Sequence, residues 1–263
     1  MSILATATIL GAAHRSPVLA SYRFHPALQQ RLRNRCRVNL SFGLHYGWAI
    51  EGAVGSEFKI DASYLSPNVT IASSIENATR IYGVSILASQ SVVELCSKSM
   101  ASNLRLIDKV IIKGSKEPLE LFCLDLDYKP LQVDDKGAVP IEWNLQHRFK
   151  SRQHLQGTKQ ALWSDEASIA ELMEGDPDFI RMRKRYNTKF FQTFNMGYQN
   201  YSQGEWQVAR DLLKKTATML NEEDGPSMAL LHYMEASHQF EAPHGWVGVH
   251  RLGEHMQQVS VSW

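Results

Sequence analysis

Residues 104–125 read LRLIDKVIIKGSKEPLELFCLD and contain two apolar runs joined by a five-residue turn, Gly-Ser-Lys-Glu-Pro. Both runs, Leu104–Lys113 and Leu119–Asp125, are short and rich in Leu, Ile and Val, which is typical of strands. The second run is apolar on both of its alternating faces, as expected of a half-buried or central strand. This stretch therefore predicts a hairpin that belongs to a sheet.

The sequence before this hairpin supplies further elements for the same sheet. A strand is predicted over Val38–Leu44, and closely spaced glycines then indicate a strand–turn–strand region over His45–Tyr64. A helix is predicted over Val69–Tyr82, because apolar and small residues recur on one helical face. Val84–Leu87 follows as a short apolar strand. This mixture of strands and helices predicts an α/β (α+β) fold.

After residue 127 the pattern becomes helical. Residues 128–146 are polar, contain two prolines and predict a linker. The triplet Asp176-Pro177-Asp178 is typical of a helix start, and we expect that helix to continue through Phe194. Aromatic residues then recur toward Leu213 with the spacing of a tetratricopeptide-like helix–turn–helix, and we expect this stripe to be core. The predicted domains are 1–127, the linker 128–146, and a helical tail over 147–263.

Composition narrows the class of protein. The chain has 263 residues, 44% of them hydrophobic and 21% charged, which argues against a mainly disordered protein. Its net charge is +1, so no global attraction to nucleic acid is expected. No apolar run in this chain approaches the roughly 18 residues that cross a membrane. Three widely separated cysteines fit a reducing compartment, and we expect a cytoplasmic location, with a membrane-anchored parent protein left open.

Four motifs, in a fixed order, resemble those of the class III nucleotidyl cyclase catalytic domain, the family of adenylate and guanylate cyclases. The motifs are FGLHYG at 42–47, YLSPNVTIASSIE at 64–76, YGVSILAS at 82–89 and KGSKEPL at 113–119. The variant of the second motif, together with the helical tail, is similar to large cyclase-like proteins of ciliates and other protists. The resemblance implies a partial, ferredoxin-like cyclase domain that pairs with a second cyclase-homology domain as a dimer or pseudo-dimer.

The resemblance also implies where the metal ions of such an enzyme would be held. The family holds Mg²⁺ or Mn²⁺ with two Asp on strands that precede the first of these motifs. Residues 1–40 contain no Asp or Glu. We therefore expect no metal site in this chain, and Mg²⁺ or Mn²⁺ only where another domain supplies the missing half.

Two further positions bear on the chemistry. The family uses an Asn to orient the ribose and, four residues later, an Arg to stabilise charge on the transferring phosphorus. The matching positions here hold Thr70 and Ser74. Loss of such an Arg costs on the order of a thousandfold in rate. The resemblance leaves Lys113, Lys116, Asn68 and Thr70 as candidate contacts for ATP or GTP.

Three functional hypotheses follow. The first is a cyclase-homology protein linked to cyclic nucleotide signalling that is inactive alone, as a regulatory half or as part of a larger cyclase. The second is an adenylate or guanylate cyclase that becomes active when joined to or paired with a domain supplying the metal-binding Asp. The third is a scaffold or adaptor that works through its helical tail.

Overall fold

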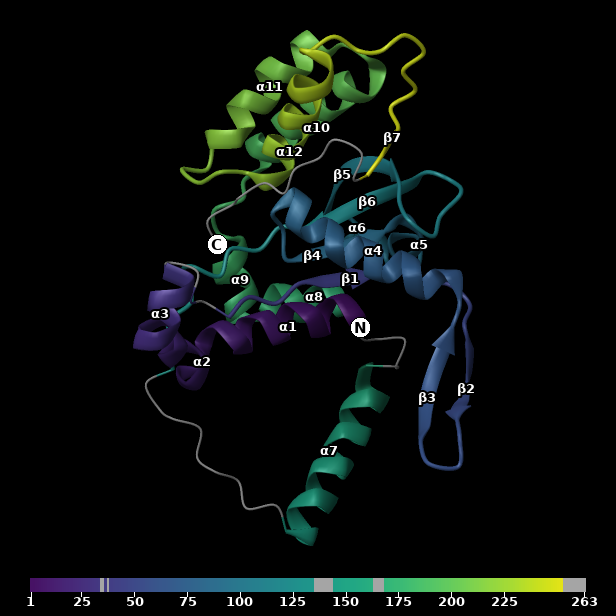
Figure 1. Cartoon of the computed structure of the whole chain (residues 1–263). Helices are drawn as coiled ribbons and strands as arrows, with labels where there is room; N and C mark the ends of the chain where they lie inside the picture. The colour runs from purple at the N-terminus through teal and green to yellow at the C-terminus, as the bar shows by residue number, and fades with distance from the viewer. Residues whose placement is uncertain (34–35, 37, 135–143, 163–167, 253–263) are drawn as a thin grey trace. The chain divides into compact units, whose positions relative to one another are not determined.

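A computed structural model describes residues 1–33, 36, 38–134, 144–162 and 168–252 (Figure 1). The chain forms two compact units, and each unit is built from two separate stretches. The helical unit combines Met1–Val38 with Asp127–Arg183, and the sheet unit combines Asn39–Leu126 with Lys184–Trp263. The domain boundaries predicted from the sequence, at residues 127 and 147, rest on the order of motifs along the chain. They stay a prediction.

The helical unit begins with three helices, and the second and third of them start at Pro17 and Pro26. Its elements are α1 (Ser2–Arg15), α2 (Pro17–Ser21), a 3-10 turn (Tyr22–Phe24), α3 (Pro26–Leu32), α7 (Leu145–Leu162), α8 (Ile169–Gly175) and α9 (Pro177–Arg183). In the described residues no single helix has both the length and the apolar character needed to cross a membrane. Only α1 combined with Pro17–Phe24, which bends away from it by 53°, meets those two criteria.

The sheet unit contains all described strands, and it confirms the mixed α/β fold. Its strands are β1 (Phe42–Leu44), β2 (Ile50–Gly55), β3 (Ile60–Leu65), β4 (Ile86–Ser89), β5 (Leu104–Ile111), β6 (Leu119–Leu124) and β7 (His250–Arg251). Five of them form one sheet in the order β1-β4-β6-β5-β7, while β2 and β3 form a separate ribbon. The pairs β1–β4 and β5–β7 are parallel, and β6 is antiparallel to both of its neighbours.

Six helices are described in the sheet unit. They are α4 (Pro67–Tyr82), α5 (Gln90–Val93), α6 (Lys98–Ala101), α10 (Thr188–Gln203), α11 (Trp206–Thr218) and α12 (Gly225–His238). One apolar core joins α4, the sheet and α10–α12. The fold is thus a sheet domain with helices donated by the later part of the chain, consistent with a ferredoxin-like domain followed by helices.

Helix α4 is fixed in place by its ends and by a close approach to β1. The Ser66 side chain accepts a hydrogen bond from the Asn68 N–H at the N-terminus, and Gly83 ends the helix with a φ of 60°. A β-carbon at Gly43 on β1 would collide with the backbone of Glu76 and Ala72. Glycine at this position therefore lets β1 and α4 pack with their backbones in near contact.

The expected continuous helix from Asp176 through Phe194 is wrong. Asp176 does cap a helix, since its side chain accepts hydrogen bonds from the N–H groups of Asp178 and Phe179. That helix ends at Arg183, however, and Asn187 caps a new one by accepting from the Phe190 N–H at 2.9 Å. The periodicity of apolar residues runs across the break, and the competing cap signal at Asn187 decides the outcome.

Candidate functional site

The positions that resemble the cyclase ribose and phosphate contacts lie on the first turns of α4, against the β5–β6 turn. The Ser74 hydroxyl donates a 3.0 Å hydrogen bond to the backbone oxygen of Lys113. Gly114, with a φ of 97°, packs so closely on α4 that an added β-carbon would lie 3.2 Å from the Thr70 side chain. The structure therefore brings Thr70, Ser74 and Lys113 together and joins Ser74 to Lys113 by a hydrogen bond.

Asn68 lies at the start of the same helix, and its side-chain amide contacts other residues of the sheet unit. Its Nδ2 donates to the backbone oxygen of Trp48 at 2.8 Å, and its Oδ1 lies 3.2 Å from Nε2 of His45. Nδ1 of His45 lies 2.8 Å from the Ser89 hydroxyl at the end of β4. These contacts tie the carboxyl ends of β1 and β4 to the start of α4, so that Asn68 holds the framework of the site together.

Lys113 and Lys116 are both exposed on the β5–β6 turn. Neither has an ion-pair partner among the described residues. An ammonium group on a turn beside a helix can contact a phosphate as a point charge. Across the described ranges, no group of three or more His, Cys, Asp or Glu side chains is placed to hold a metal ion. The chemistry that these residues can offer is anion contact, hydroxyl hydrogen bonding and positioning.

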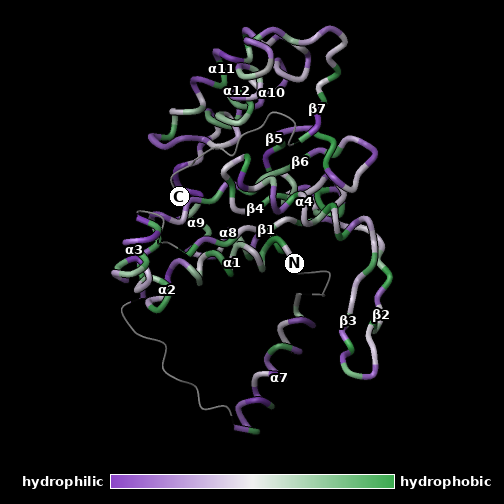
Figure 2. The backbone as a smooth tube through the Cα atoms, in the orientation of Figure 1, coloured by the Kyte–Doolittle hydropathy of each residue, from purple (hydrophilic) through white to green (hydrophobic). Residues whose placement is uncertain are grey.

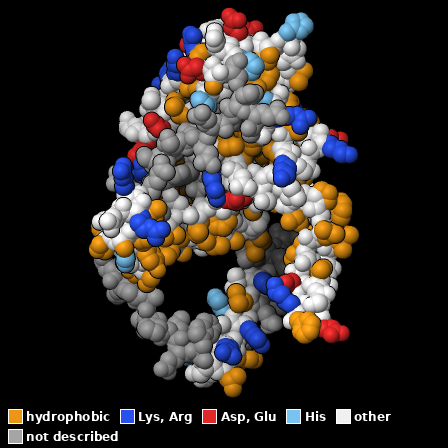
Figure 3. All heavy atoms as spheres, in the orientation of Figure 1, with side chains coloured by type: hydrophobic (Ala, Val, Ile, Leu, Met, Phe, Trp, Pro, Cys, Tyr) orange, Lys and Arg blue, Asp and Glu red, His pale blue; other side chains and the backbone are white. Residues whose placement is uncertain are grey.

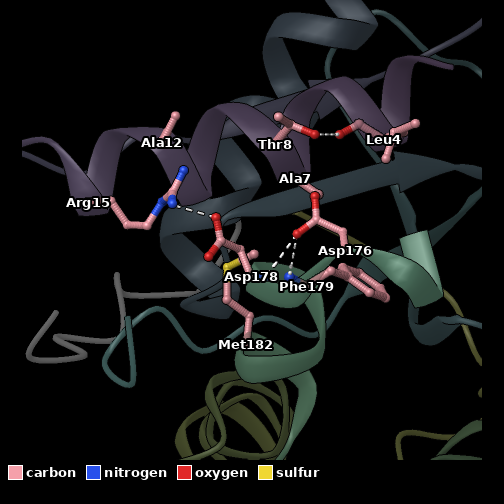
Figure 4. A pocket seen from close by; sticks show the side chains of 9 residues that line it. All are labelled: Leu4, Ala7, Thr8, Ala12, Arg15, Asp176, Asp178, Phe179 and Met182. Carbon is pink, nitrogen blue, oxygen red and sulfur yellow. Dashed lines mark hydrogen bonds and ion pairs between the residues drawn. The ribbon is translucent and has the colours of Figure 1, made fainter. Parts of the chain in front are cut away.

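A small pocket lies in the helical unit, between α1 and α9 (Figure 4). Its cavity volume is about 100 Å³, below the roughly 300 Å³ at which typical ligand sites begin. Arg15 Nε lies 3.0 Å from an Asp178 carboxylate oxygen at its rim. Asp176 beside it caps α9. The charged groups of this pocket are therefore already bound within the unit, Arg15 to Asp178 and Asp176 to backbone N–H groups of α9, and we assign the pocket no ligand.

A cluster around Arg105 joins β5 and β6 to the later helices. Arg105 is 4% exposed; its Nε and Nη2 donate to Asp125 at 3.0 and 2.5 Å, and its Nη1 and Nη2 donate to Asp224 at 3.1 and 2.8 Å. The rings of Phe190 and Phe194 lie 4.9 and 4.3 Å from the guanidinium carbon. Burial acts to lower the pKa of Arg105, but the two carboxylates outweigh it and raise that pKa well above its usual value.

A second buried cluster surrounds Asp108 on β5. Tyr82 donates to one carboxylate oxygen at 2.6 Å, and the Lys109 N–H donates to the other at 2.7 Å. Nε2 of His250 on β7 lies 3.8 Å from the carboxylate, and Tyr201 lies 3.2 Å from Nδ1 of the same ring. Burial raises the pKa of Asp108, against the opposing effects of His250 and the two hydrogen bonds.

We expect Asp108→Asn to remove a pH dependence of stability. Because the folded-state pKa of Asp108 is raised, its favourable contribution is present at low pH and is lost as pH rises through that pKa. From about pH 4 upward, the free energy of unfolding of the wild-type protein should therefore fall relative to that of the variant. Urea unfolding at a series of pH values measures this difference.

Asp61→Asn is the matched control, because Asp61 is an exposed carboxylate paired with Lys59 at 2.8 Å. An effect shared by both Asp→Asn variants would then be independent of burial. Parallel pH profiles for wild type and Asp108→Asn would contradict the assignment.

Sequence reasoning missed both buried clusters. The sequence did carry a signal for them, since Arg105 and Asp108 interrupt a largely apolar strand. Charged side chains are buried in such a strand only when other groups pair with them. Their partners are distant in the sequence: Asp224 follows Arg105 by more than a hundred residues, and His250 is further still. A single sequence offers no way to match such pairs.

Comparison with known proteins gives two partial similarities. The chain is 37% identical over 87 residues to an adenylate cyclase of Anabaena cylindrica, covering 33% of this chain and 17% of that protein. It is 33% identical over 81 residues to adenylate cyclase 1 of Rhizobium meliloti (strain 1021), covering 31% and 12%. The chain thus spans less than a fifth of either relative. No protein-family model and no solved structure matches it. About a third of the chain is therefore similar to adenylate cyclases, which supports a cyclase-like domain.

Proposed function

We propose that this chain is a cyclase-homology protein of cyclic nucleotide signalling that turns over no nucleotide alone and regulates a second cyclase domain by pairing with it. The similarity to two adenylate cyclases supports the cyclase-related role. In this proposal Mg²⁺ or Mn²⁺ is held by the partner's residues. The reaction under control is attack of the ribose 3′-hydroxyl of ATP or GTP on the α-phosphorus, with release of pyrophosphate.

The observation that carries the proposal is the contact between Ser74 and the β5–β6 turn. The family's Arg at this position must reach out to the transferring phosphorus. Here a short hydroxyl donates instead to the backbone oxygen of Lys113. Thr70, at the position of the ribose-orienting Asn, packs against Gly114. Both side chains thus stabilise the turn, and neither carries the charge that this chemistry needs.

The β2–β3 ribbon is the surface that we assign to the partner domain. In the described part of the chain its strands pair only with each other, and large apolar residues along both strands are exposed. Figure 2 shows hydrophobic positions along the ribbon, and Figure 3 shows hydrophobic side chains at its surface. Phe58 near its tip is 96% exposed, and Ile60 is 73% exposed. An isolated two-stranded ribbon is marginally stable in water, and a contiguous exposed apolar surface marks an interaction site. Strand β1, which has only β4 as a strand partner in the described part of the chain, offers a second pairing edge.

Pairing of this kind predicts inhibition. A cyclase that forms two sites across a dimer needs the metal-binding Asp from one subunit and the Asn–Arg pair from the other. A mixed dimer containing this chain has Thr70 and Ser74 in one site. Its other site receives no Asp from residues 1–40, which contain none. Both sites of the mixed dimer are then incomplete.

The test uses the purified full chain and the catalytic domain of the Anabaena cylindrica adenylate cyclase. We expect the chain alone, with Mn²⁺ or Mg²⁺ and ATP or GTP, to form no cyclic nucleotide. Added in excess to the active domain, it should lower cyclic AMP formation in proportion to the mixed dimer formed. Cyclic nucleotide production by the chain alone would overturn the proposal, and so would unchanged activity of the mixture.

Two variants sharpen this result. Val54→Glu places a charge on the exposed face of the ribbon, where the valine is 64% exposed, and should abolish the inhibition while the chain stays folded. The double variant Thr70→Asn/Ser74→Arg completes one site of the mixed dimer. In the mixture, this variant should restore a substantial part of the cyclase activity, because such an Arg raises the rate on the order of a thousandfold. The variant chain alone should stay inactive.

A further inference from the structure

The C-terminal end of the described chain is attached to the sheet by a strand of two residues, β7 (Figure 1). This strand pairs in parallel with β5 at His250 and Arg251. Beyond them, the Leu252 N–H donates a 3.0 Å hydrogen bond to the backbone oxygen of Ile111. Of the two strand residues, His250 is buried and Arg251 is exposed. So few backbone hydrogen bonds hold a strand weakly, and the attachment of β7 therefore depends on the His250 side chain.

His250 lies in a buried site formed by tyrosines and one carboxylate. The residue is 7% exposed, and its ring stacks on Tyr233 at a centroid distance of 4.1 Å. Its Nδ1 lies 3.2 Å from the Tyr201 hydroxyl. Its Nε2 has no hydrogen-bond partner in the described part of the chain and lies 3.8 Å from a carboxylate oxygen of Asp108. This separation is too long for a hydrogen bond and short enough for an ion pair.

The groups packed around this pair are phenols. Four buried tyrosines surround it: Tyr82 of α4, Tyr198 and Tyr201 of α10, and Tyr233 of α12. Burial raises the pKa of each of these phenols, so they stay uncharged at neutral pH. Lys109 follows Asp108 on β5, but its ammonium group pairs with Glu120 at 3.3 Å. Within the described residues, His250 is therefore the one basic side chain at ion-pair distance from Asp108.

We propose that His250 is a pH-sensitive latch, which holds β7 on the sheet while its ring is protonated and releases the strand as the ring loses its proton. A protonated ring presents an N–H and a positive charge to the buried Asp108 carboxylate, and this attraction is strong where water is excluded. The neutral ring leaves a buried carboxylate without an opposite charge, which is costly. Histidine changes its charge between about pH 5 and 8. Because protonation favours the closed strand, closure is favoured on the acidic side of this range and is lost as the pH rises through it.

Two further observations support a latch at this place. Burial raises the pKa of Asp108, and the charge of His250 opposes this rise, as expected of two groups that interact directly. Gly245 and Gly248 precede β7 with φ angles of 81° and 74°, a conformation that glycine adopts without strain. Such residues can absorb the backbone rotation that a hinge needs. Release of β7 uncovers backbone groups at the edge of β5, where another strand can pair, whether or not the sheet unit pairs with a cyclase.

The test is amide hydrogen exchange of the full chain between about pH 5.5 and 8, the range in which histidine titrates. Exchange rates are converted to protection factors, which removes the intrinsic pH dependence of exchange. We expect the protection of the Leu252 amide to fall by about tenfold or more as the pH rises, the effect of one pKa unit of coupling. Protection of the Leu213 amide should fall less, because α11 stays folded when β7 opens.

Two variants and a control test the assignment to this pair. His250→Gln keeps a polar side chain without the titrating ring, and Asp108→Asn removes the charge that the ring meets. Each should make Leu252 protection independent of pH, whatever its absolute level. His244→Gln is the matched control, because His244 is exposed in the loop before β7, and it should keep the wild-type pH dependence. The proposal is overturned if wild-type Leu252 protection is constant or rises with pH, or if it falls equally at Leu213. A pH dependence that survives in His250→Gln, or is lost in His244→Gln, would overturn it as well.

Discussion

Replacing Arg105 with alanine should lower the free energy of unfolding of the sheet unit by about 4 kcal/mol, the usual cost of breaking a buried ion pair by removing one partner. The side chain is 1% exposed, and the side chains of Asp125 and Asp224 are 2% and 6% exposed. Without the guanidinium, two carboxylates stay buried next to each other with no positive charge between them. Denaturant unfolding followed by circular dichroism measures the loss.

Lys109→Ala is the control on the same strand. Lys109 pairs with Glu120 at 3.3 Å, but its side chain is 41% exposed, so its removal should cost less than about 1 kcal/mol. A loss below about 1 kcal/mol for Arg105→Ala at neutral pH would show that the cluster contributes little to stability.

Trp206→Ala should lower the free energy of unfolding by a similar amount, about 3–5 kcal/mol. Trp206 is 1% exposed and packs on the rings of Tyr201, Tyr233 and Trp246 with centroid distances of 5.8, 6.0 and 5.0 Å. Its indole N–H also donates to the backbone oxygen of Tyr201 at 3.0 Å. Truncation leaves a large cavity at the centre of α10–α12, while the Tyr201 carbonyl keeps its hydrogen bonds from Trp246 and the Gly204 N–H. Thermal and urea unfolding measure the effect.

Trp48→Ala provides the matched comparison. The same atoms are removed, but Trp48 is 64% exposed, so the stability of the isolated chain should change by less than about 1 kcal/mol. Equal losses for the two tryptophans would contradict the core assignment of Trp206. Because Trp48 precedes the exposed ribbon, a selective loss of pairing with a cyclase domain is the effect expected of this variant instead.

Local patterns predict most elements of the sheet unit correctly. The α4 helix follows from the periodic placement of Ile71 and Ile75, and both are buried. The two runs around Gly114 form the predicted hairpin of β5 and β6. The aromatic stripe through Tyr201 and Trp206 is core, as predicted. These elements succeed because burial of a single face fixes both their period and their register.

What the sequence does not reveal is how distant parts of the chain combine. The partnership of β5 with β7 rests on two residues, His250 and Arg251, too few to leave a periodic pattern. The candidate site shows the same division. The motifs single out Thr70, Ser74 and Lys113, but the hydrogen bond from Ser74 to the turn depends on backbone geometry that no spacing encodes.

The interrupted path of the chain through the sheet unit has a consequence for its synthesis. The ribosome makes β5 and β6 first, then residues 127–183 of the other unit, and only afterwards α10–α12. At about 5–20 residues per second, this detour holds the nascent sheet without its helices for several seconds. During that interval the apolar faces around Ile107 and Leu121 lack the helices that cover them, and Arg105 has Asp125 but still lacks Asp224. The newborn chain should therefore depend on chaperones until residue 250 has left the ribosome.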